Sequence, residues 1–158
     1  MSDPIKTAPH KSSLGGLDAN LMALLCYVAA FVIGLIPGIR YVAFLAPLAL
    51  YFLEKGSRFV KFHAMQAFML QLLYMLLNLI LSLIGTAVLA GSATSLIMGS
   101  AVGLGTALGG GAIFGVLIGI VSLVAWVLAI VAAVKAYGYT EYEIPLLGGL
   151  ARKLMGKF

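Results

Sequence analysis

The side chains that could do chemistry are concentrated on one face of an apolar segment that begins near residue 63. Polar and small residues recur there at alternating spacings of four and three: His63, Ala67, Gln71, Tyr74, Asn78, Ser82 and Gly85. In a helix, this spacing places all of them on one face. Polar groups at membrane depth must meet protein or water. Two interpretations stay open: a hydrated path or substrate groove, or hydrogen bonds between helices, each worth ~0.6 kcal/mol.

Catalytic and metal-binding patterns do not occur in this sequence. The two histidines are His63 and His10, and His10 falls in a polar N-terminal stretch. No Cys, Asp or Glu stands at ligand spacing from His63, so we predict no metal site and no cofactor. No nucleophile has a base and an acid beside it, and Glu54, Glu141 and Glu143 all flank apolar segments. We therefore expect a protein that is not an enzyme.

The composition is that of a membrane protein. Of 158 residues, 63% are hydrophobic and only 9% are charged, and the mean hydropathy is +1.12. A soluble domain carries about a quarter charged residues. The net charge is +5, but the basic residues are thinly spread beside apolar runs, so we expect no nucleic-acid partner. The single Cys26 cannot form an internal disulfide.

Four apolar segments predict an all-α integral membrane bundle of four transmembrane helices. We expect one membrane domain over 17–136, with spans at about 17–36, 39–53, 64–90 and 112–135. About 20 helical residues cross a hydrocarbon layer of ~30 Å. The second segment is shorter than this and contains Pro47, so it is either a short span or an arm of a re-entrant hairpin. An uncharged, Gly-rich connection at 91–111 separates the last two spans.

Both ends of the chain are more polar than the middle. Residues 1–16 cannot bury much apolar surface, so we predict a flexible cytoplasmic tail. Residues 137–158 predict a cytoplasmic interfacial tail that ends in a short amphipathic helix. Drawn as a helix, its apolar side holds Leu150, Leu154 and Phe158, and its basic side holds Arg152, Lys153 and Lys157. Such a helix suits an anionic inner leaflet, and a frayed, solvated tail is the alternative.

The distribution of basic residues indicates the orientation. With four passes, nine of the ten Lys and Arg residues lie on one side: two in the tail, three in 54–63 and four at the C-terminal end. Arg40 alone lies on the other side. Because cytoplasmic flanks carry the excess of basic residues, we expect both termini and the segment 54–63 in the cytoplasm. The expected location is the prokaryotic cytoplasmic (inner) membrane.

Small residues recur at four-residue spacing in the fourth apolar segment. Gly111, Gly115 and Gly119 share one helical face and would let another backbone approach closely. We expect that neighbour to be another helix of the same chain, and a second copy of the chain is the alternative.

Four pieces of sequence together resemble a known family. They are Leu24-Leu25-Cys26-Tyr27, the segment Glu54 to Gln66 with Arg58-Phe59-Val60-Lys61-Phe62-His63 at its centre, Lys135-Ala136-Tyr137-Gly138, and Glu141-Tyr142-Glu143-Ile144-Pro145-Leu146. They resemble small bacterial and archaeal multi-pass membrane proteins of unknown function that are related to the import-channel subunit of the chloroplast inner envelope. Magnetosome membrane proteins are in the same group. The resemblance implies an architecture more firmly than an activity, because one fold serves unrelated tasks. The long 91–111 connection departs from the short connection usual in the family.

We expect the protein to act as a non-enzymatic subunit or scaffold that binds another membrane component. The candidate interface residues come from the family-like pieces: Arg58, Phe59, Lys61, Phe62, His63, Gln66, Lys135, Tyr137, Glu141 and Pro145. The expected partners are the bilayer with its anionic inner leaflet and another membrane protein or a second copy. The alternative is a translocation or channel element whose polar path follows Gln71, Tyr74, Asn78 and Ser82.

His63 and Gln66 enter the membrane with hydrogen-bonding groups that need partners. We predict that they bond to the segment 137–143, because the topology places that segment at the same inner surface. Simple anchoring of the 58–63 segment in the lipid interface is the alternative.

The orientation can be tested by cysteine labelling in intact cells. In a Cys26→Ala background, a cysteine placed within 91–111 is expected to react with a membrane-impermeant thiol reagent, because that connection faces outward. The inward-facing control, Arg58→Cys, stays unlabelled until the cells are opened. The orientation is wrong if Arg58→Cys reacts in intact cells and the 91–111 position does not.

Overall fold

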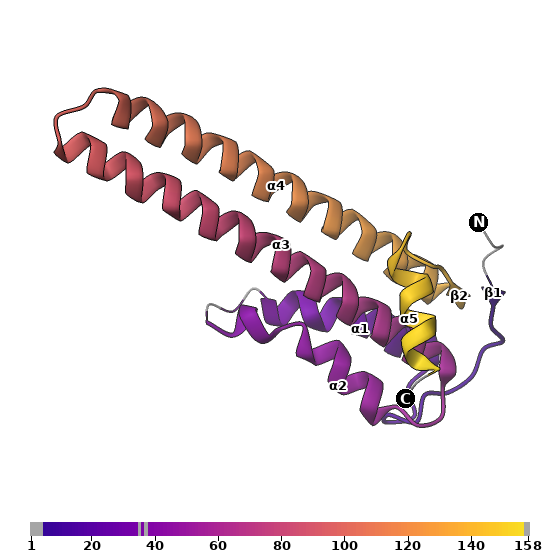
Figure 1. Ribbon diagram of the computed structural model, residues 1–158. Coiled ribbons are helices and arrows are strands. Elements are labelled where there is room, and N and C mark those ends of the chain that lie inside the picture. Colours follow the sequence, from indigo (N-terminus) through magenta and orange to yellow (C-terminus); the bar gives the residue numbers. More distant parts are fainter. Residues whose placement is uncertain (1–4, 35, 37, 157–158) are drawn as a thin grey trace. The chain divides into compact units, whose positions relative to one another are not determined.

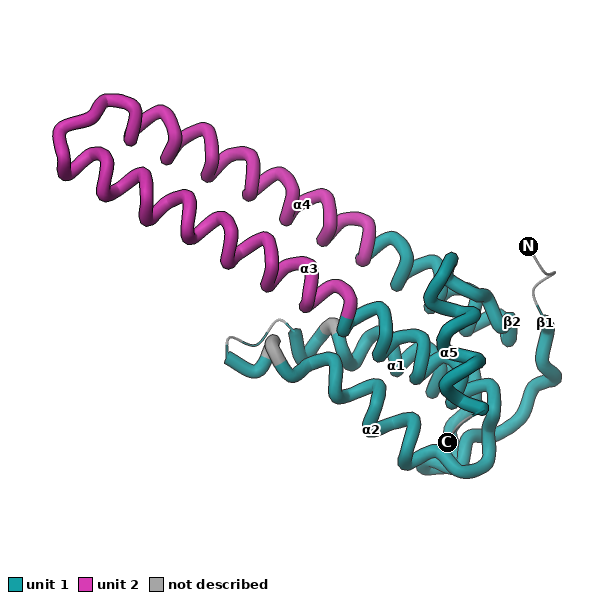
Figure 2. The backbone as a smooth tube through the Cα atoms, viewed as in Figure 1, with its two compact units in different colours: residues 1–72, 126–158 teal, residues 73–125 magenta. Residues whose placement is uncertain are grey.

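The computed structural model describes residues 5–34, 36 and 38–156 and is mostly helical (Figure 1). The predictions made for residues 1–4, for Pro37 and for Lys157 and Phe158 lie outside this part. The described chain forms two compact units, one of residues 1–72 with 126–158 and one of residues 73–125 (Figure 2).

Unit 1 contains the shorter elements and most of the buried residues. Its elements are β1 (Ile5–Lys6), α1 (Ala19–Gly34), a 3-10 helix η1 (Ile39–Val42), α2 (Leu45–Leu53), β2 (Thr140–Glu141) and α5 (Leu147–Met155), with the first part of α3 and the last part of α4. The two strands pair antiparallel, with Ile5 opposite Glu141 and Lys6 opposite Thr140. The core consists mainly of alanine, methionine and aromatic side chains from α1, α3 and α4.

The first two apolar segments form short helices. The 16 residues of α1 cover only about 24 Å. The 9 residues of α2 cover about 14 Å, so the prediction of a short second segment is confirmed. Pro47 lies in the first turn of α2, where its missing N–H removes no helical hydrogen bond. α1 and α2 lie side by side within unit 1 (Figure 1).

Two long helices, α3 (Arg58–Ile97) and α4 (Val102–Tyr137), have 40 and 36 residues. By length and composition, both could cross a membrane. Within unit 2 they form a hairpin that turns at residues 98–101, where Gly99 has a φ of +80°.

The sequence left the conformation of the Gly-rich stretch at 91–111 open, and the structure makes it helical apart from the turn at 98–101. Glycine costs a helix only about 1 kcal/mol per residue. A backbone group without a hydrogen bond costs more in apolar surroundings. The stretch also lacks proline, so the helical hydrogen bonds can form throughout.

The close approaches within the hairpin occur at other glycines than those predicted. A Cβ at Gly103 would lie 2.6 Å from the carbonyl oxygen of Ser92, and one at Gly110 would lie 2.7 Å from Val88. Gly111 meets Leu89 only at 3.8 Å, and Gly115 and Gly119 have no neighbour within 4 Å in the described chain. The expected packing of the 111, 115 and 119 face inside the chain is therefore corrected. The α3–α4 contact uses a different face of α4.

Gly103→Ala is expected to destabilise the protein, because the new Cβ meets backbone atoms that cannot turn aside. Overpacking of this kind costs ~1 to 3 kcal/mol. The matched control, Gly115→Ala, has open space around it and gains about 1 kcal/mol of helix propensity. Thermal unfolding in detergent should show a lower midpoint for Gly103→Ala only. A similar loss in both variants would contradict this assignment of the contact.

Candidate functional site

Gln66 connects three elements of unit 1 through one buried amide. Its Oε1 accepts the backbone N–H of Ile144 at 3.0 Å, and its Nε2 donates to the Tyr142 carbonyl at 3.1 Å. The same Nε2 donates to the Tyr27 hydroxyl at 2.9 Å. The side chain is fully buried. The amide therefore holds α1, α3 and the segment after α4 together.

These bonds determine the state of His63. The Ile144 N–H can only donate, so Oε1 of Gln66 must face it and Nε2 must face Tyr27. Since the Tyr27 hydroxyl accepts from Gln66, its own proton goes to Nδ1 of His63 at 3.0 Å. His63 is then neutral, with its proton on Nε2. Among the described residues, this Nε2 has no hydrogen bond of normal geometry.

His63 is enclosed by aromatic rings. The ring centroids of Phe59, Phe62 and Tyr27 lie 4.7, 5.2 and 5.9 Å from that of the imidazole. Phe59, Phe62 and His63 are at most 1% exposed. This enclosure leaves no open face of His63 toward a ligand or a partner.

The predicted bond to the segment 137–143 is confirmed for Gln66, which reaches Tyr142, and its other backbone contact, Ile144, lies just beyond that segment. It takes a different form for His63, whose hydrogen bond goes to Tyr27 of α1. The sequence analysis missed Tyr27 as a site residue. Its place in the family-like piece before Val28 was the available signal.

The candidate interface residues divide into buried and exposed members. Phe59, Phe62, His63 and Gln66 are buried and so cannot touch a partner directly. Lys61 and Glu141 are half-buried, whereas Arg58, Lys135, Tyr137 and Pro145 are exposed. The buried members build the fold of unit 1, and the exposed members remain available for binding.

Arg152 of α5 pairs with carboxylates of its own chain. It forms an ion pair with Glu141 at 3.0 Å, a second ion pair with Glu143, and its guanidinium lies 4.6 Å from the Phe62 ring centroid. Burial acts to lower the pKa of Arg152, but Glu143 and Glu141 raise it overall. The sequence analysis placed Arg152 on the basic side of the terminal helix and did not foresee these two carboxylate partners. Lys153, on the same predicted basic side of the helix, is exposed.

A second polar cluster surrounds the buried carboxylate of Glu54, which lies between α2 and α3. It accepts hydrogen bonds from the hydroxyls of Ser12 and Ser13 and from the Ser13 N–H at 3.1 Å. The N–H groups of Gly56 and Ser57 donate to it at 2.8 and 2.9 Å. Glu54 therefore caps the start of α3 and binds the N-terminal segment at once.

The predicted flexible tail missed these contacts. From residue 5 onward, the segment lies against unit 1 through β1, through the Thr7 N–H donating to the Tyr139 carbonyl at 2.9 Å, and through His10, whose Nε2 lies 2.7 Å from the Ser57 hydroxyl. Composition predicted disorder because the segment has few apolar groups. In the structure, hydrogen bonds hold the N-terminal segment in place. Composition does not reveal such bonds, because serine is equally common in disordered segments.

The polar stripe of the third apolar segment lies along α3, and hydrogen bonds engage part of it. In unit 2, the Tyr74 hydroxyl lies 3.4 Å from that of Ser122, and Asn78 donates to the Tyr74 carbonyl at 2.9 Å. Ser82 is exposed, and Gln71 belongs to unit 1 and is half-buried. Hydrogen bonds inside the hairpin therefore account for Tyr74 and Asn78.

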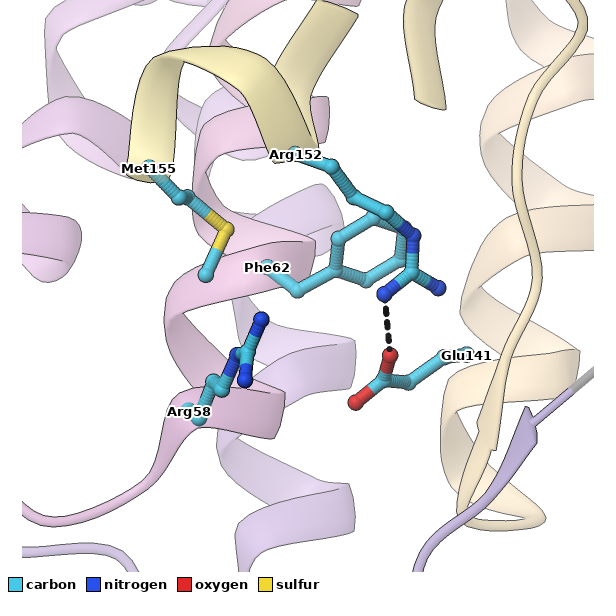
Figure 3. A pocket seen from close by; sticks show the side chains of 5 residues that line it. All are labelled: Arg58, Phe62, Glu141, Arg152 and Met155. Carbon is cyan, nitrogen blue, oxygen red and sulfur yellow. Dashed lines mark ion pairs between the residues drawn. The ribbon is translucent and has the colours of Figure 1, made fainter. Parts of the chain in front are cut away.

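A small open hollow lies at the end of unit 1 where α3 begins. Arg58, Phe62, Glu141, Arg152 and Met155 line it, and their side chains converge on it from α3, α5 and the segment after α4 (Figure 3). In the described part of the chain, no group of three or more His, Cys, Asp or Glu side chains could hold a metal ion.

Gln66→Ala is expected to lower the stability of the protein in detergent. The substitution leaves the buried Ile144 N–H and Tyr142 carbonyl without partners, and each such loss costs about 1 to 3 kcal/mol. Gln71→Ala removes the same chemical group from a half-buried position of the same helix and serves as the control. Thermal unfolding should distinguish the two variants. Equal midpoints would show that the amide is not a structural connector.

The contacts of the N-terminal segment with Glu54 are expected to weaken in acid. Burial acts to raise the pKa of Glu54, but hydrogen bonds from Ser12, Ser13 and the Ser57 backbone lower it from 4.5 to about 2. The folded pKa is the lower one, so this stabilisation is present above about pH 4.5 and is lost as the pH falls toward 2.

Hydrogen exchange of the Ser13 amide, which donates to Glu54, measures this directly. Its protection, corrected for the intrinsic exchange rate, should fall across that acid range in the wild type. In Glu54→Gln, which cannot ionise, the same amide should show no such step. Protection that persists unchanged through the window in the wild type would refute the assignment.

Comparison with known proteins places the chain in a family. Residues 18–151 match the model of the magnetosome magnetite crystal formation protein family. The UPF0132 membrane protein MJ1443 of Methanocaldococcus jannaschii is 32% identical over 144 residues, which cover 90% of this chain and 93% of the relative. A second protein of that organism, the UPF0132 membrane protein MJ1527, is 29% identical over 143 residues, covering 90% of this chain and 74% of the relative.

No solved structure matches the chain. The family match spans α1 to the first part of α5, including Tyr27, Glu54, His63 and Gln66, and it ends one residue before Arg152. The chain is a membrane protein that belongs to the magnetosome magnetite crystal formation protein family.

Proposed function

We propose that this protein is a non-enzymatic, four-pass subunit or scaffold of a prokaryotic inner membrane that binds another membrane component. Both termini and residues 54–63 lie in the cytoplasm in this proposal. The docking face is the exposed part of the family-like pieces, centred on Tyr137, whose side chain is 56% exposed.

The observation that carries the proposal is that the polar residues of the family-like pieces form hydrogen bonds within the chain itself. Gln66, His63 and Tyr27 bond to one another and to the backbone after α4. Glu54 is occupied by five hydrogen bonds from its own chain. Apart from Nε2 of His63, these enclosed polar groups satisfy one another, so they stabilise a scaffold but offer a substrate little to bind.

The two long helices support a role in assembly. In the most apolar window of each, only 6% of the residues are buried inside the protein. Lipid or other membrane proteins must therefore cover most of both helices. At 1.5 Å per residue, α3 measures about 60 Å, twice the ~30 Å hydrocarbon layer. Even at a tilt of about 40°, α3 is longer than the hydrocarbon layer is thick. Part of the helix therefore extends beyond the bilayer, where a partner could contact it.

We propose a topology of four membrane passes. The lengths of α3 and α4 support two of them, and the nine basic residues on one side support an even number of crossings. The short α1 and α2 complete the set either as thin spans or as a re-entrant pair.

The description of the family concerns magnetite crystal formation, and the curated relatives are named only as membrane proteins. A scaffold that organises other components at a membrane surface is a role that such proteins can share without sharing a substrate. The channel alternative has less support, because Tyr74 and Asn78 bond within the α3–α4 hairpin.

The proposal is tested by copurification of the tagged protein in mild detergent, followed by mass spectrometry. We expect one membrane protein, or a second copy, at fixed stoichiometry, and we expect its recovery to fall in Tyr137→Ala. Val116→Ala changes an apolar residue that is 61% exposed on the same helix and should leave recovery unchanged. A solitary chain that conducts ions in a planar bilayer would replace the scaffold proposal with the channel alternative.

A further inference from the structure

The α3–α4 hairpin lies within a long stretch of the chain that carries no charge. No Lys, Arg, Asp or Glu occurs between Lys61 and Lys135, and α3 and α4 fill that stretch apart from the turn at 98–101. At 1.5 Å per residue, the uncharged part of each helix measures about 50 Å. The hydrocarbon layer of an ordinary bilayer is only ~30 Å thick. A helix pair of this length must tilt, thicken the bilayer or leave its end outside it.

Tilt alone does not accommodate this length. Membrane helices tilt by up to about 40°, and at that angle about 50 Å of helix still extends about 38 Å along the bilayer normal. The excess is about 8 Å, which corresponds to roughly two turns of each helix. Lys61 and Lys135 hold the other end of both helices at the head groups. The excess therefore falls at the turn of the hairpin.

The end of the hairpin at the turn is as apolar and as exposed as the rest of it. Val102, Leu104 and Leu108 of α4 are 70%, 55% and 67% exposed, and Val134 at the opposite end of the same helix is 64% exposed. Large apolar patches of this kind are unfavourable in water. The last turns therefore need an apolar covering as much as the middle of the hairpin does.

The hydroxyl groups near the turn are also arranged as apolar surroundings require. Ser92, Thr94, Ser95 and Thr106 each donate to a carbonyl four residues earlier in their own helix, at 2.8, 3.1, 3.0 and 3.1 Å. Serine and threonine form such bonds where water is not there to accept them. These hydroxyls therefore add little cost to covering this part of the hairpin with hydrocarbon.

The exposed side chains are spread too widely around α4 for one protein partner to cover them. At 100° per residue, they occupy more than half of the helix circumference; the members that define this arc are Val102, Leu104, Leu108, Val116 and Leu117. A helix that packs against another helix buries a narrower stripe. Acyl chains reach a helix from every free side, so they match this distribution better than a second helix does.

We propose that the α3–α4 hairpin binds long-chain phospholipids and thereby holds the protein in membrane regions with a hydrocarbon layer thicker than ~30 Å. The recognised group is the acyl chain rather than the head group. In such a region the acyl chains cover the last turns of the hairpin, while Lys61 and Lys135 stay among the head groups. The inference goes beyond the proposed function and needs no partner protein.

The chain's single tryptophan, Trp126, allows a direct test. It lies in α4 and is 42% exposed, so brominated acyl chains that touch this helix quench its fluorescence. The full chain is reconstituted into phosphatidylcholine vesicles, in which a brominated lipid competes with unbrominated lipids of fourteen-carbon or twenty-two-carbon chains. We expect the longer chains to relieve quenching about threefold better, because they reduce the mismatch. Equal relief, or better relief by the shorter chains, overturns the proposal.

A matched pair of variants locates the effect. Leu108→Lys shortens the uncharged part of α4 to about 39 Å, which an ordinary bilayer accommodates at a tilt of about 40°, so the preference for long chains should disappear. Met98→Lys places the same charge in the turn itself, where Met98 is 82% exposed, and leaves both helices as long as before. This control should keep the preference. If Leu108→Lys keeps it too, the proposal is wrong.

The protein density in the vesicles distinguishes lipid from a second copy of the chain. With about one chain per vesicle, no second copy is present, and the preference of the wild type for long chains should persist. A preference that appears only at high protein density would show that a second copy covers the end of the hairpin, and it would overturn the lipid assignment. These vesicles contain no other protein, so the outcome is independent of whether copurification finds a partner.

Discussion

The constraint on which the rest of unit 1 depends is that a buried amide near the start of a membrane helix must be satisfied by protein. Gln66 meets this constraint with three hydrogen bonds to Tyr27, Tyr142 and Ile144. Because no water competes inside such a site, leaving any of these groups unpaired would cost more than the bond itself contributes. The amide thereby fixes where the chain after α4 must return. The positions of β2, and of α5 after it, follow from that return.

The carboxylate of Glu54, between α2 and α3, likewise connects several segments of unit 1 through hydrogen bonds. Its hydrogen bonds to Gly56 and Ser57 begin α3, and those from Ser12 and Ser13 hold the N-terminal segment. A charge buried this completely persists only when several donors surround it. The N-terminal segment is therefore part of the solvation of Glu54.

The sequence predicts those features in which one physical effect outweighs the others. The apolar runs predicted helices at about the right places, because burial in lipid and backbone hydrogen bonding favour the same conformation. The link from Gln66 to the chain after α4 was predictable because a polar group at membrane depth needs a partner. The docking of residues 5–16 was not predictable, since it depends on serine hydroxyls whose hydrogen bonds leave no periodic pattern.

Other features could not be read from the sequence because opposing physical effects nearly cancel. The Gly-rich stretch at 91–111 has low helix propensity, and only the cost of unpaired backbone in apolar surroundings makes it helical. Several small residues shared faces of α4, and spacing alone could not show that Gly103 and Gly110, rather than Gly115, meet α3. Arg152 lay on the basic side of an amphipathic pattern, and two glutamates outside that pattern decide its direction.

The α3–α4 hairpin of unit 2 differs from unit 1 in what holds it together. Lipid tails are as apolar as leucine side chains, so no hydrophobic force drives the two helices together in a bilayer. What remains is close approach at Gly85, Gly103 and Gly110, with hydrogen bonds between Ser92 and Thr106 and between Tyr74 and Ser122. Contacts this sparse stabilise a hairpin only modestly. The exposed apolar faces of the hairpin need only lipid around them, and the docking face that we propose around Tyr137 belongs to unit 1 instead.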